Sequence, residues 1–266
     1  EQAVFNKFQD LVYEKSGITL GPQKVALVSA RIGKRMRALG IDDHKTYLRY
    51  VTADNNQTEI VHMLDAISTN VTSFFRENVH FDFLFTVLKQ WLEQGQRTFR
   101  IWCAAASTGE EPYCIAMMCQ EALGNAGCDV RILATDISTR VLEVCRKGEY
   151  EKSKVAPVPP MLRKKYFQAH GKGEAQRFLI SPELRKLISF NRLNLSTPPF
   201  PMKGPMDVVF CRNVMIYFDT AVRTHLVREI HRLLKPGGYL IIGHSESLTG
   251  IDVPFSPIQS AVHKKN

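Results

Sequence analysis

The sequence lacks several features that would assign a chain of 266 residues to a familiar class. No apolar run approaches the roughly 20 residues that a membrane-spanning helix needs. The 6 cysteines include no C-x-x-C pair, and none stands at zinc-ligand spacing from a histidine. We therefore expect reduced thiols, no metal centre and a cytoplasmic location.

The glycine-rich turn G-x-G-x-x-G, through which many proteins approach a dinucleotide, is also missing. The stretch that organises the chain instead reads FRIWCAAASTGEEP, at 99–112. Its apolar start predicts a buried strand over 99–103, and the apolar spacing that follows predicts a helix over 113–123. Gly109 suits a turn with positive φ, and Ser107 and Thr108 suit the helix N-cap. Strand, turn and helix indicate the first unit of a doubly wound α/β sheet.

A second predicted strand, over 130–136, ends in Asp136, where a carboxylate can accept both ribose hydroxyls of an adenosine ligand. Glu110 and Glu111 would repel a phosphate at the helix N-terminus, but they suit a ligand with positive charge. S-adenosylmethionine carries a ribose, a sulfonium and an ammonium, so it fits this pattern best. An NAD-like dinucleotide is the second interpretation, and a β-α-β unit that only builds core is the third.

The first 70 residues show helical apolar spacing over 4–16, 24–39, 45–51 and 57–68. The second of these segments has no acidic residue, and its basic residues are Lys24, Arg31, Lys34, Arg35 and Arg37. Such a helix is either a solvated face or a docking surface for an acidic partner. Five cations without an acidic neighbour, in a chain of net charge +9, favour the docking surface.

Residues 151–190 interrupt the alternation of strands and helices and indicate a small β-rich insertion, with one strand over 177–180 and another over 184–190 that leads into the main sheet. An apolar run then predicts a central strand over 206–211. A helix over 220–234 is stopped by KPGG, and a further strand covers 239–243. This late order of helix, Pro-Gly-Gly and apolar strand is common in S-adenosylmethionine-dependent methyltransferase folds.

With these segments placed, the chain resembles the CheR family, the protein-glutamate O-methyltransferases that modify bacterial chemoreceptors. The resemblance runs from about residue 5 to the C-terminus. Its motifs are TNVTSFFRE at 69–77, AAASTGEEPY at 104–113, ATDI at 134–137, FCRNVMIYF at 210–218 and GHSE at 243–246. The resemblance implies an all-helical domain at 1–70, a linker at 71–80 and a Rossmann-like methyltransferase domain at 81–266 that contains the insertion.

The resemblance also implies the site residues. Contacts to S-adenosylmethionine are expected from Asn70, Thr72, Arg76, one of Glu110 and Glu111, Asp136, Asn194, Leu195, Arg212 and Asn213. Of the two glutamates we favour Glu111. The candidate catalytic residues are Arg76 and Tyr217, with Tyr217 near the transferred methyl group. The basic positions Lys24, Arg31, Arg35 and Arg37 match those that the family uses to bind receptor helices, and Lys34 shares a helix face with Arg31 and Arg35.

The implied partner is the cytoplasmic helical bundle of a chemoreceptor, so we expect a monomer that is recruited to membrane receptor arrays. The insertion would hold a receptor's C-terminal peptide along a strand edge. A nucleic-acid methyltransferase is the main alternative. It would need a motif such as Asn-Pro-Pro-Tyr to grip a base, and the RNVMIY sequence at 212–217 is not one. A module that only senses the cofactor is a further alternative.

Overall fold

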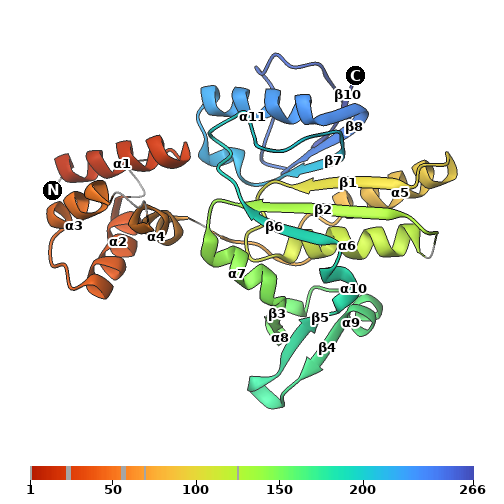
Figure 1. Cartoon of the computed structure of the whole chain (residues 1–266), viewed down its shortest axis with the longest axis horizontal. Helices are drawn as coiled ribbons and strands as arrows, with labels where there is room; N and C mark the ends of the chain where they lie inside the picture. The colour runs from red at the N-terminus through yellow and green to blue at the C-terminus, as the bar shows by residue number, and fades with distance from the viewer. Residues whose placement is uncertain (1, 22–24, 55–57, 69, 125) are drawn as a thin grey trace.

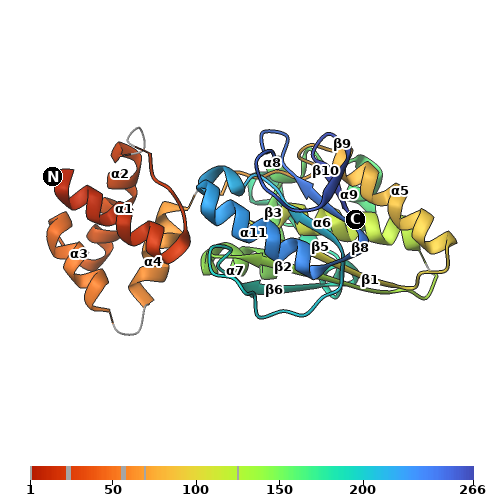
Figure 2. The same cartoon turned by 90° about the horizontal axis from the view of Figure 1, so that it is seen from above.

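The computed structural model describes residues 2–21, 25–54, 58–68, 70–124 and 126–266. A bundle of N-terminal helices lies to one side of an α/β domain, and a small sheet projects from that domain (Figures 1 and 2). The bundle contains α1 (Gln2–Ser16), α2 (Val25–Leu39), α3 (His44–Ala53) and α4 (Thr58–Ile67). The helices expected in this part of the chain are therefore confirmed, except that Lys24 and Gln57, the first residues of two of them, lie outside the described residues.

The four helices of the bundle enclose one apolar core, to which α1 contributes Phe8 and Val12, α2 Ile32 and α4 Met63. Asp43 begins α3 as its N-cap, because its carboxylate accepts a hydrogen bond from Thr46 N–H at 2.9 Å. The bundle thus has its own core, separate from the two cores of the α/β domain.

The large sheet has the order β6-β2-β1-β7-β8-β10-β9, and its strands are parallel from β6 to β8. These strands are β1 (Thr98–Cys103), β2 (Asp129–Asp136), β6 (Ile188–Arg192), β7 (Met206–Cys211) and β8 (Leu234–Ile242). The order reverses around β1, so ligands are expected at the carboxyl ends of the central strands. The expected doubly wound, Rossmann-like fold is confirmed.

Helices cover both faces of this sheet. α5 (Val79–Glu93) and α6 (Glu110–Leu123) pack on one face, and α11 (Thr220–Leu233) packs on the other. Adjacent residues of β1 accordingly join different cores, Ile101 on the α6 side and Trp102 on the α11 side. α7 (Thr139–Lys147) contacts β2 and β6, and Ser138 caps it by accepting Val141 N–H. In the described part of the chain, no helix is long and apolar enough to span a membrane.

The small sheet is antiparallel, with β5 between its two neighbours. It consists of β3 (Glu149–Glu151), β4 (Phe167–His170) and β5 (Arg177–Ile180), with the short helices α8 (Lys152–Val155), α9 (Pro160–Tyr166) and η2 (Gly173–Ala175). The expected strand over 184–190 is wrong in its first half. Pro182 starts a short helix, α10 (Pro182–Arg185), instead of a strand. The strand that follows from Ile188 belongs to the large sheet, as expected.

The C-terminal part differs from expectation in two ways. The KPGG segment does not merely stop α11, because β8 begins at Leu234 and includes these residues with a shifted register against β7. The last two strands, β9 (Phe255–Gln259) and β10 (Val262–Lys265), were not expected from the sequence. β10 runs antiparallel to β8, so the sheet is mixed rather than purely parallel.

Candidate active site

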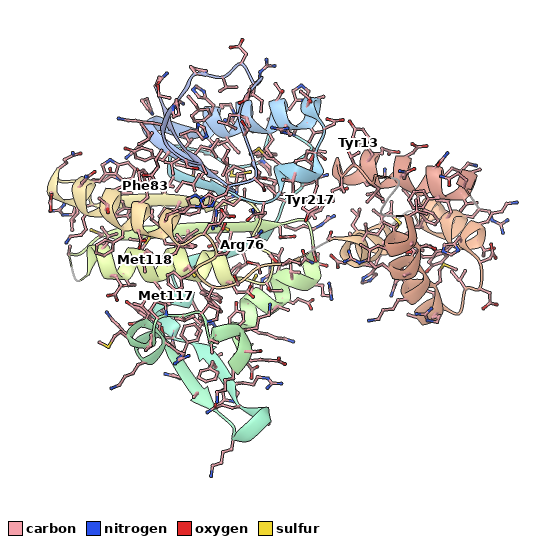
Figure 3. All side chains as sticks on the ribbon, turned by 180° about the vertical axis from the view of Figure 1, so that it is seen from behind. Tyr13, Arg76, Phe83, Met117, Met118 and Tyr217 are labelled. Atoms are coloured by element: carbon pink, nitrogen blue, oxygen red, sulfur yellow. The ribbon has the colours of Figure 1, made fainter. Side chains whose placement is uncertain are left out.

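A cleft lies between the helical bundle and the carboxyl edge of the large sheet. The bundle side contributes Leu20, Leu27, Val28 and Arg31, and the sheet side contributes Ser107, Glu111, Asp136, Arg212, Asn213 and Tyr217. The linker between the two parts adds Asn70, Thr72 and Arg76. Figure 3 shows Arg76 and Tyr217 near the junction of the two parts of the chain. The cleft therefore collects residues that are far apart in the sequence.

The segment after α1 attaches the bundle to the sheet at the edge of this cleft. Thr19 N–H donates to the Tyr217 carbonyl at 2.8 Å, and Ile18 forms an isolated β-bridge with Phe218. The Asn194 side-chain amide donates to the Lys15 carbonyl at 2.9 Å. The N-terminal segment thus sets where the Tyr217 backbone lies.

The turn between β1 and α6 depends on a glycine. Gly109 is the N-cap of α6 at φ 99°, and a Cβ there would lie 2.6 Å from the Tyr150 hydroxyl oxygen. No side chain caps this helix, so the expectation that Ser107 or Thr108 does so is wrong. Ser107 itself has φ 48°, a backbone conformation that costs a non-glycine residue about 1–3 kcal/mol. This turn brings the Ser107 side chain to the cleft.

Asp136 stands at the end of β2 with its carboxylate buried. It accepts hydrogen bonds from Ser107 N–H at 2.9 Å and Ser138 N–H at 3.0 Å. Burial raises the pKa of Asp136 to about 6, against the effect of these two donors. The group therefore changes its charge near neutral pH.

The two glutamates at the start of α6 point to different places. Glu110 is fully buried, accepts the Thr108 hydroxyl at 2.6 Å and faces Lys154, and it is not among the described residues that line the cleft. Glu111 lines the cleft and pairs with Arg212 at 2.6 Å. Burial raises the pKa of Glu111, although Arg212 acts in the opposite direction. Of the two, Glu111 is the one that a ligand in this cleft would meet.

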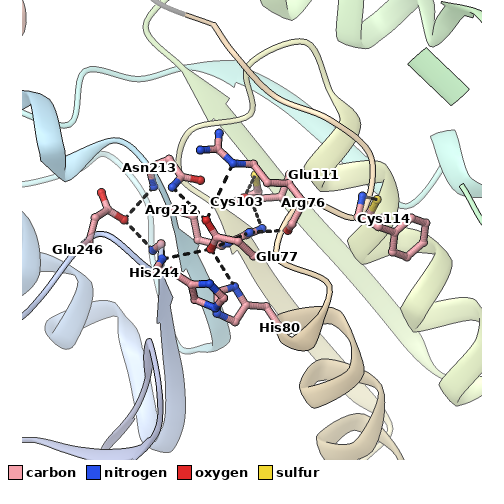
Figure 4. Close-up of polar contacts among 12 residues, drawn as sticks. Arg76, Glu77, His80, Cys103, Glu111, Cys114, Arg212, Asn213, His244 and Glu246 are labelled. Carbon is pink, nitrogen blue, oxygen red and sulfur yellow. Dashed lines mark hydrogen bonds and ion pairs between the residues drawn. The ribbon is translucent and has the colours of Figure 1, made fainter. Parts of the chain in front are cut away.

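Arg212 lines the cleft and links three other residues by hydrogen bonds and ion pairs, as Figure 4 shows. Its guanidinium donates to Glu111, to Glu77 at 3.1 Å and to the Arg76 carbonyl, and its side chain is 1% exposed. Burial would lower the pKa of Arg212, but the two glutamates outweigh burial and raise it. One permanent cation is thus held between two carboxylates beside the cleft.

Among the described residues that line the cleft, three buried side-chain atoms have no hydrogen-bond partner within the protein. They are the Asn70 amide nitrogen, the Ser107 hydroxyl and Arg212 Nε. Buried polar groups are normally satisfied, so these atoms fit a polar ligand that occupies the cleft. An adenosine ligand with positive charge suits this donor set, because Asp136 faces it from β2 and Glu111 from α6.

The two candidate catalytic residues both line the cleft. The Arg76 side chain is 39% exposed, donates to the Val71 carbonyl at 3.0 Å and lies 3.9 Å from Glu77. Tyr217 ends the short helix η3 (Met215–Tyr217) after β7. Both are therefore accessible to a substrate that enters from outside.

A second hollow continues from Asp136 toward Leu195. Asn194 also lines this hollow, but its side-chain amide is already engaged with Lys15 and Ser196. Leu195 is buried and supplies an apolar wall. This hollow has the composition that an adenine ring requires, apolar with few polar atoms.

The basic residues of α2 separate into groups that the sequence did not distinguish. Arg31 donates to the Ile67 and Ser68 carbonyls and lines the cleft. Arg35 forms two hydrogen bonds with Glu59 of α4, so the expectation that this helix lacks an acidic neighbour is wrong. The side chains of Lys34 and Arg37 are exposed.

Two residues of the site, Glu77 and Ser107, stand inside the motifs at 69–77 and 104–113 but were not assigned to the site from the sequence, which offered Ser107 only as a helix cap. Glu77, His80 and His244 also group their ligand atoms within 4.8 Å of one another. The Glu77 carboxylate is however paired with Arg212, and burial lowers the pKa of His80 to about 4. The expected absence of a metal centre stays a prediction.

The sheet is doubly wound, the helix after its first strand begins with two glutamates, and its second strand ends in an aspartate. With a cleft at the carboxyl edge of these strands, this is the architecture of an S-adenosylmethionine-dependent methyltransferase. The family model described as "CheR methyltransferase, SAM binding domain" matches residues 70–263, and "CheR methyltransferase, all-alpha domain" matches residues 3–68. The chain belongs to the CheR methyltransferase family.

Curated relatives match most of the chain. The chemotaxis protein methyltransferase of Salmonella typhimurium is 38% identical, over 96% of this chain and 87% of its own length. The corresponding protein of Escherichia coli is 36% identical over the same shares. Chemotaxis protein methyltransferase 2 of Pseudomonas aeruginosa is 37% identical, over 91% of this chain and 86% of its own length.

Solved structures of methyltransferases overlap with this one only in part. The glycopeptide N-methyltransferase MtfA complexed with S-adenosylmethionine is 16% identical over 68% of this chain and 58% of its own, with a TM-score of 0.35. A similarity of that size supports no conclusion about this chain.

Proposed function

We propose that this methyltransferase transfers a methyl group from S-adenosylmethionine to glutamate side chains of chemoreceptors, which forms methyl esters in chemotactic adaptation. The observation that carries the proposal is the cleft itself. Its inner wall has carboxylates and unpaired polar atoms for an adenosine cofactor, and its outer part has Arg76 and Tyr217 as accessible donors for a carboxylate. The names of the curated relatives support the same substrate.

The proposed chemistry requires no general base. A glutamate side chain has an ordinary pKa of about 4.3 and is already ionised at pH 7. When bound, the cofactor supplies an activated methyl group on a sulfonium. The protein then contributes position, by holding the acceptor oxygen in line with that methyl group. Arg76 with its forked donor and Tyr217 with its phenol are suited to orient the two carboxylate oxygens.

We assign the cofactor contacts to Asn70, Thr72, Arg76, Glu111, Asp136, Asn194, Leu195, Arg212 and Asn213. The Asp136 carboxylate would accept the ribose hydroxyls, and Leu195 would border the adenine. Glu111 would face the positive end of the cofactor while its other contacts, to Arg212 and to the Cys103 thiol, hold it in place. Asn194 would contact the cofactor through its backbone, since its side-chain amide already bonds to Lys15 and Ser196.

The exposed part of α2 is the proposed docking surface for the receptor. Lys34 and Arg37 are exposed, and Arg31 leads from the same helix into the cleft. The glutamates of a receptor helix would be attracted by these cations of α2, and one glutamate would then reach Arg76 and Tyr217 in the cleft. Lys24 belongs to the proposal by its position in the sequence, although it lies outside the described residues.

The small sheet is the proposed tethering site for the receptor's C-terminal peptide. β4 is an edge strand that pairs only with β5 among the described strands, and its last three residues are exposed. An extended peptide would add to this edge as a further strand and raise the local concentration of substrate to about millimolar. The tether does not alter the chemistry, because the small sheet contributes none of the described residues that line the cleft.

We further propose that the protein acts as a monomer in the cytoplasm, at membrane receptor arrays. The deciding experiment is transfer of labelled methyl from S-adenosylmethionine to a purified cognate receptor. We expect label on the receptor that mild base releases, as an ester requires. Label on added nucleic acid, or base-stable label on protein, would contradict the proposal.

The tether has a separate test. We expect the C-terminal peptide of a cognate receptor to bind the wild-type protein and to bind a Gly171→Val variant more weakly. Gly171 has φ 75° in the turn after β4, and a Cβ there would lie 2.8 Å from the Ala175 carbonyl oxygen. If no receptor tail binds the wild type, the tether is wrong while the methyltransferase assignment stands.

A further inference from the structure

Glu246 lies in the loop after β8 and accepts four backbone hydrogen bonds. One carboxylate oxygen accepts Val214 N–H at 3.0 Å and Met215 N–H at 2.8 Å. The other accepts Asn213 N–H at 2.8 Å and Gly243 N–H at 2.7 Å. Figure 4 shows Glu246 beside Asn213. A single side chain therefore joins the loop after β7 to the end of β8.

The loop that Glu246 holds has an unusual backbone conformation. Asn213 has φ 57°, in the left-handed region, which asparagine adopts more readily than other non-glycine residues. The next amides, of Val214 and Met215, lead into the short helix η3, whose first N–H groups have no partner within the helix. The carboxylate stabilises this conformation by supplying acceptors to all three amides.

The space around Asn213 is also restricted. A Cβ at Gly243 would lie 2.5 Å from the Asn213 side-chain nitrogen and 2.9 Å from the nearer Glu246 oxygen. On its other side, the same nitrogen donates to Glu77 at 3.3 Å. The Asn213 side-chain amide is thus held between Gly243 and Glu77, and Glu77 in turn pairs with Arg212.

We propose that Glu246 is a positioning residue for the methyl transfer. It is not among the described residues that line the cleft, but the loop that it holds carries Asn213 and Tyr217, which do line it. Removing an acceptor oxygen would leave backbone N–H groups of this loop without their partner, so the loop would shift and move both side chains. The inference rests on the proposed function only for its activity readout, since cofactor binding and amide exchange report on the loop directly.

The test uses the Glu246→Gln variant, which keeps the size of the side chain but replaces one acceptor oxygen by an NH2 group. That group would face backbone N–H donors and bind none of them. We expect the amides of residues 213–215 to exchange about tenfold faster or more in hydrogen–deuterium exchange. We expect kcat at saturating S-adenosylmethionine to fall about 10- to 100-fold, because small displacements cost that much in a positioned reaction. Calorimetry should show weaker binding of S-adenosylhomocysteine.

The matched control is Glu229→Gln. Glu229 is buried and, like Glu246, accepts a backbone hydrogen bond, from Phe200 N–H at 2.7 Å. It pairs with Arg232 and lies outside the described lining of the cleft. We expect this control to lose stability in a thermal melt while its kcat and its binding of S-adenosylhomocysteine stay near wild type. Gly243→Ala provides a second variant, because its Cβ would press on both the Asn213 side-chain nitrogen and the nearer Glu246 oxygen while both carboxylate oxygens remain as acceptors.

The outcomes are distinguishable. Wild-type exchange, binding and turnover in Glu246→Gln would overturn the inference, and so would losses matched by Glu229→Gln. If Glu246→Gln does not fold, Gly243→Ala decides: weaker S-adenosylhomocysteine binding and lower kcat support the inference, and wild-type values refute it. If the wild-type protein labels no receptor, the proposed function fails, while amide exchange and S-adenosylhomocysteine binding still test Glu246.

Discussion

Burial and one buried arginine decide the charge of the carboxyl groups around the cleft. Burial raises the pKa of Asp136 to about 6 and raises that of Glu111 as well. Burial would also raise the pKa of Glu77, but the guanidinium of Arg212 outweighs it and holds that pKa below its ordinary value. Three similar side chains within one site therefore differ in the pH at which they ionise.

For Asp136 the direction of the pH effect follows from its raised pKa. In the unliganded protein the folded state holds the proton more tightly than the unfolded state, whose pKa is the ordinary 3.8. The contribution of this group to stability is therefore full at low pH and is lost as pH rises through about 6. A ligand whose hydroxyls donate to the ionised carboxylate would recover part of that loss.

We therefore predict that affinity for S-adenosylhomocysteine rises between pH 5 and pH 7, because below pH 6 the carboxyl group must release a proton to bind. The variant Asp136→Asn should bind with about 2–3 kcal/mol less free energy at pH 7 and should lose this pH dependence. Calorimetry at several pH values measures both. If the variant keeps the wild-type pH dependence, another group is responsible.

The two arginines of the cleft should behave in opposite ways. Arg76→Ala should lower turnover strongly with little change in melting temperature, because its side chain is 39% exposed and pairs only loosely with Glu77. Arg212→Ala should destabilise the fold by up to about 3–5 kcal/mol, because it leaves the largely buried carboxylates of Glu77 and Glu111 without their cation. Thermal melts and receptor methylation assays compare the two. An early melt of Arg76→Ala would make Arg76 a structural residue.

At the scale of one helix, α2 has residues that pack the bundle next to residues of the proposed docking surface. Arg35 and Tyr47 both donate to Glu59, which is buried, so this part of the helix holds the bundle together. Lys34 and Arg37, by contrast, are exposed. A charge reversal at Arg35 therefore cannot distinguish a docking role from a folding role.

We predict that Arg35→Glu lowers the melting temperature sharply, since it places a second carboxylate against Glu59. The double variant Lys34→Glu/Arg37→Glu should melt like wild type and bind S-adenosylhomocysteine normally, yet methylate receptor more slowly. Melting curves and methylation assays on the same preparations provide the comparison. Full methylation by the double variant would leave α2 as a solvated helix face.

At the scale of the whole molecule, two parts with separate cores share one cleft. Tyr13 of α1 donates to Asp219 before α11 at 2.6 Å, and Thr139 of α7 donates to Asp65 of α4 at 3.1 Å. These contacts lie at the junction, where Figure 3 shows Tyr13. The cleft that the bundle and the sheet form together depends on them.

The net charge of +9 belongs to the molecule as a whole and leads to a last prediction. Receptor methylation should slow as salt concentration rises, because exposed charges are screened beyond about 10 Å at 0.1 M ionic strength. Affinity for S-adenosylhomocysteine should change little, since its proposed contacts lie inside the cleft. Steady-state rates and calorimetry across a salt series separate the two effects. Equal salt dependence of both would argue against electrostatic docking.

The sequence alone determined the features that depend on neighbours along the chain. The apolar run of β1, the glycine turn and the apolar spacing of α6 predict a strand-turn-helix unit, because backbone conformation and side-chain periodicity are local properties. Asp136 was identified in the same way, as a carboxylate that ends a predicted strand. The fold class and the likeness to the CheR family follow from such local patterns.

Only the tertiary structure decided which charged groups meet. Glu111 and Arg212 are 101 positions apart, and Arg35 and Glu59 are 24 apart, so no local pattern indicates either pair. Pairing over such distances depends on strand order and helix packing, which bring together side chains that the sequence separates. Glu110 and Glu111, adjacent and chemically alike, differ for the same reason: the helix directs one toward Thr108 and Lys154, and the other toward the cleft.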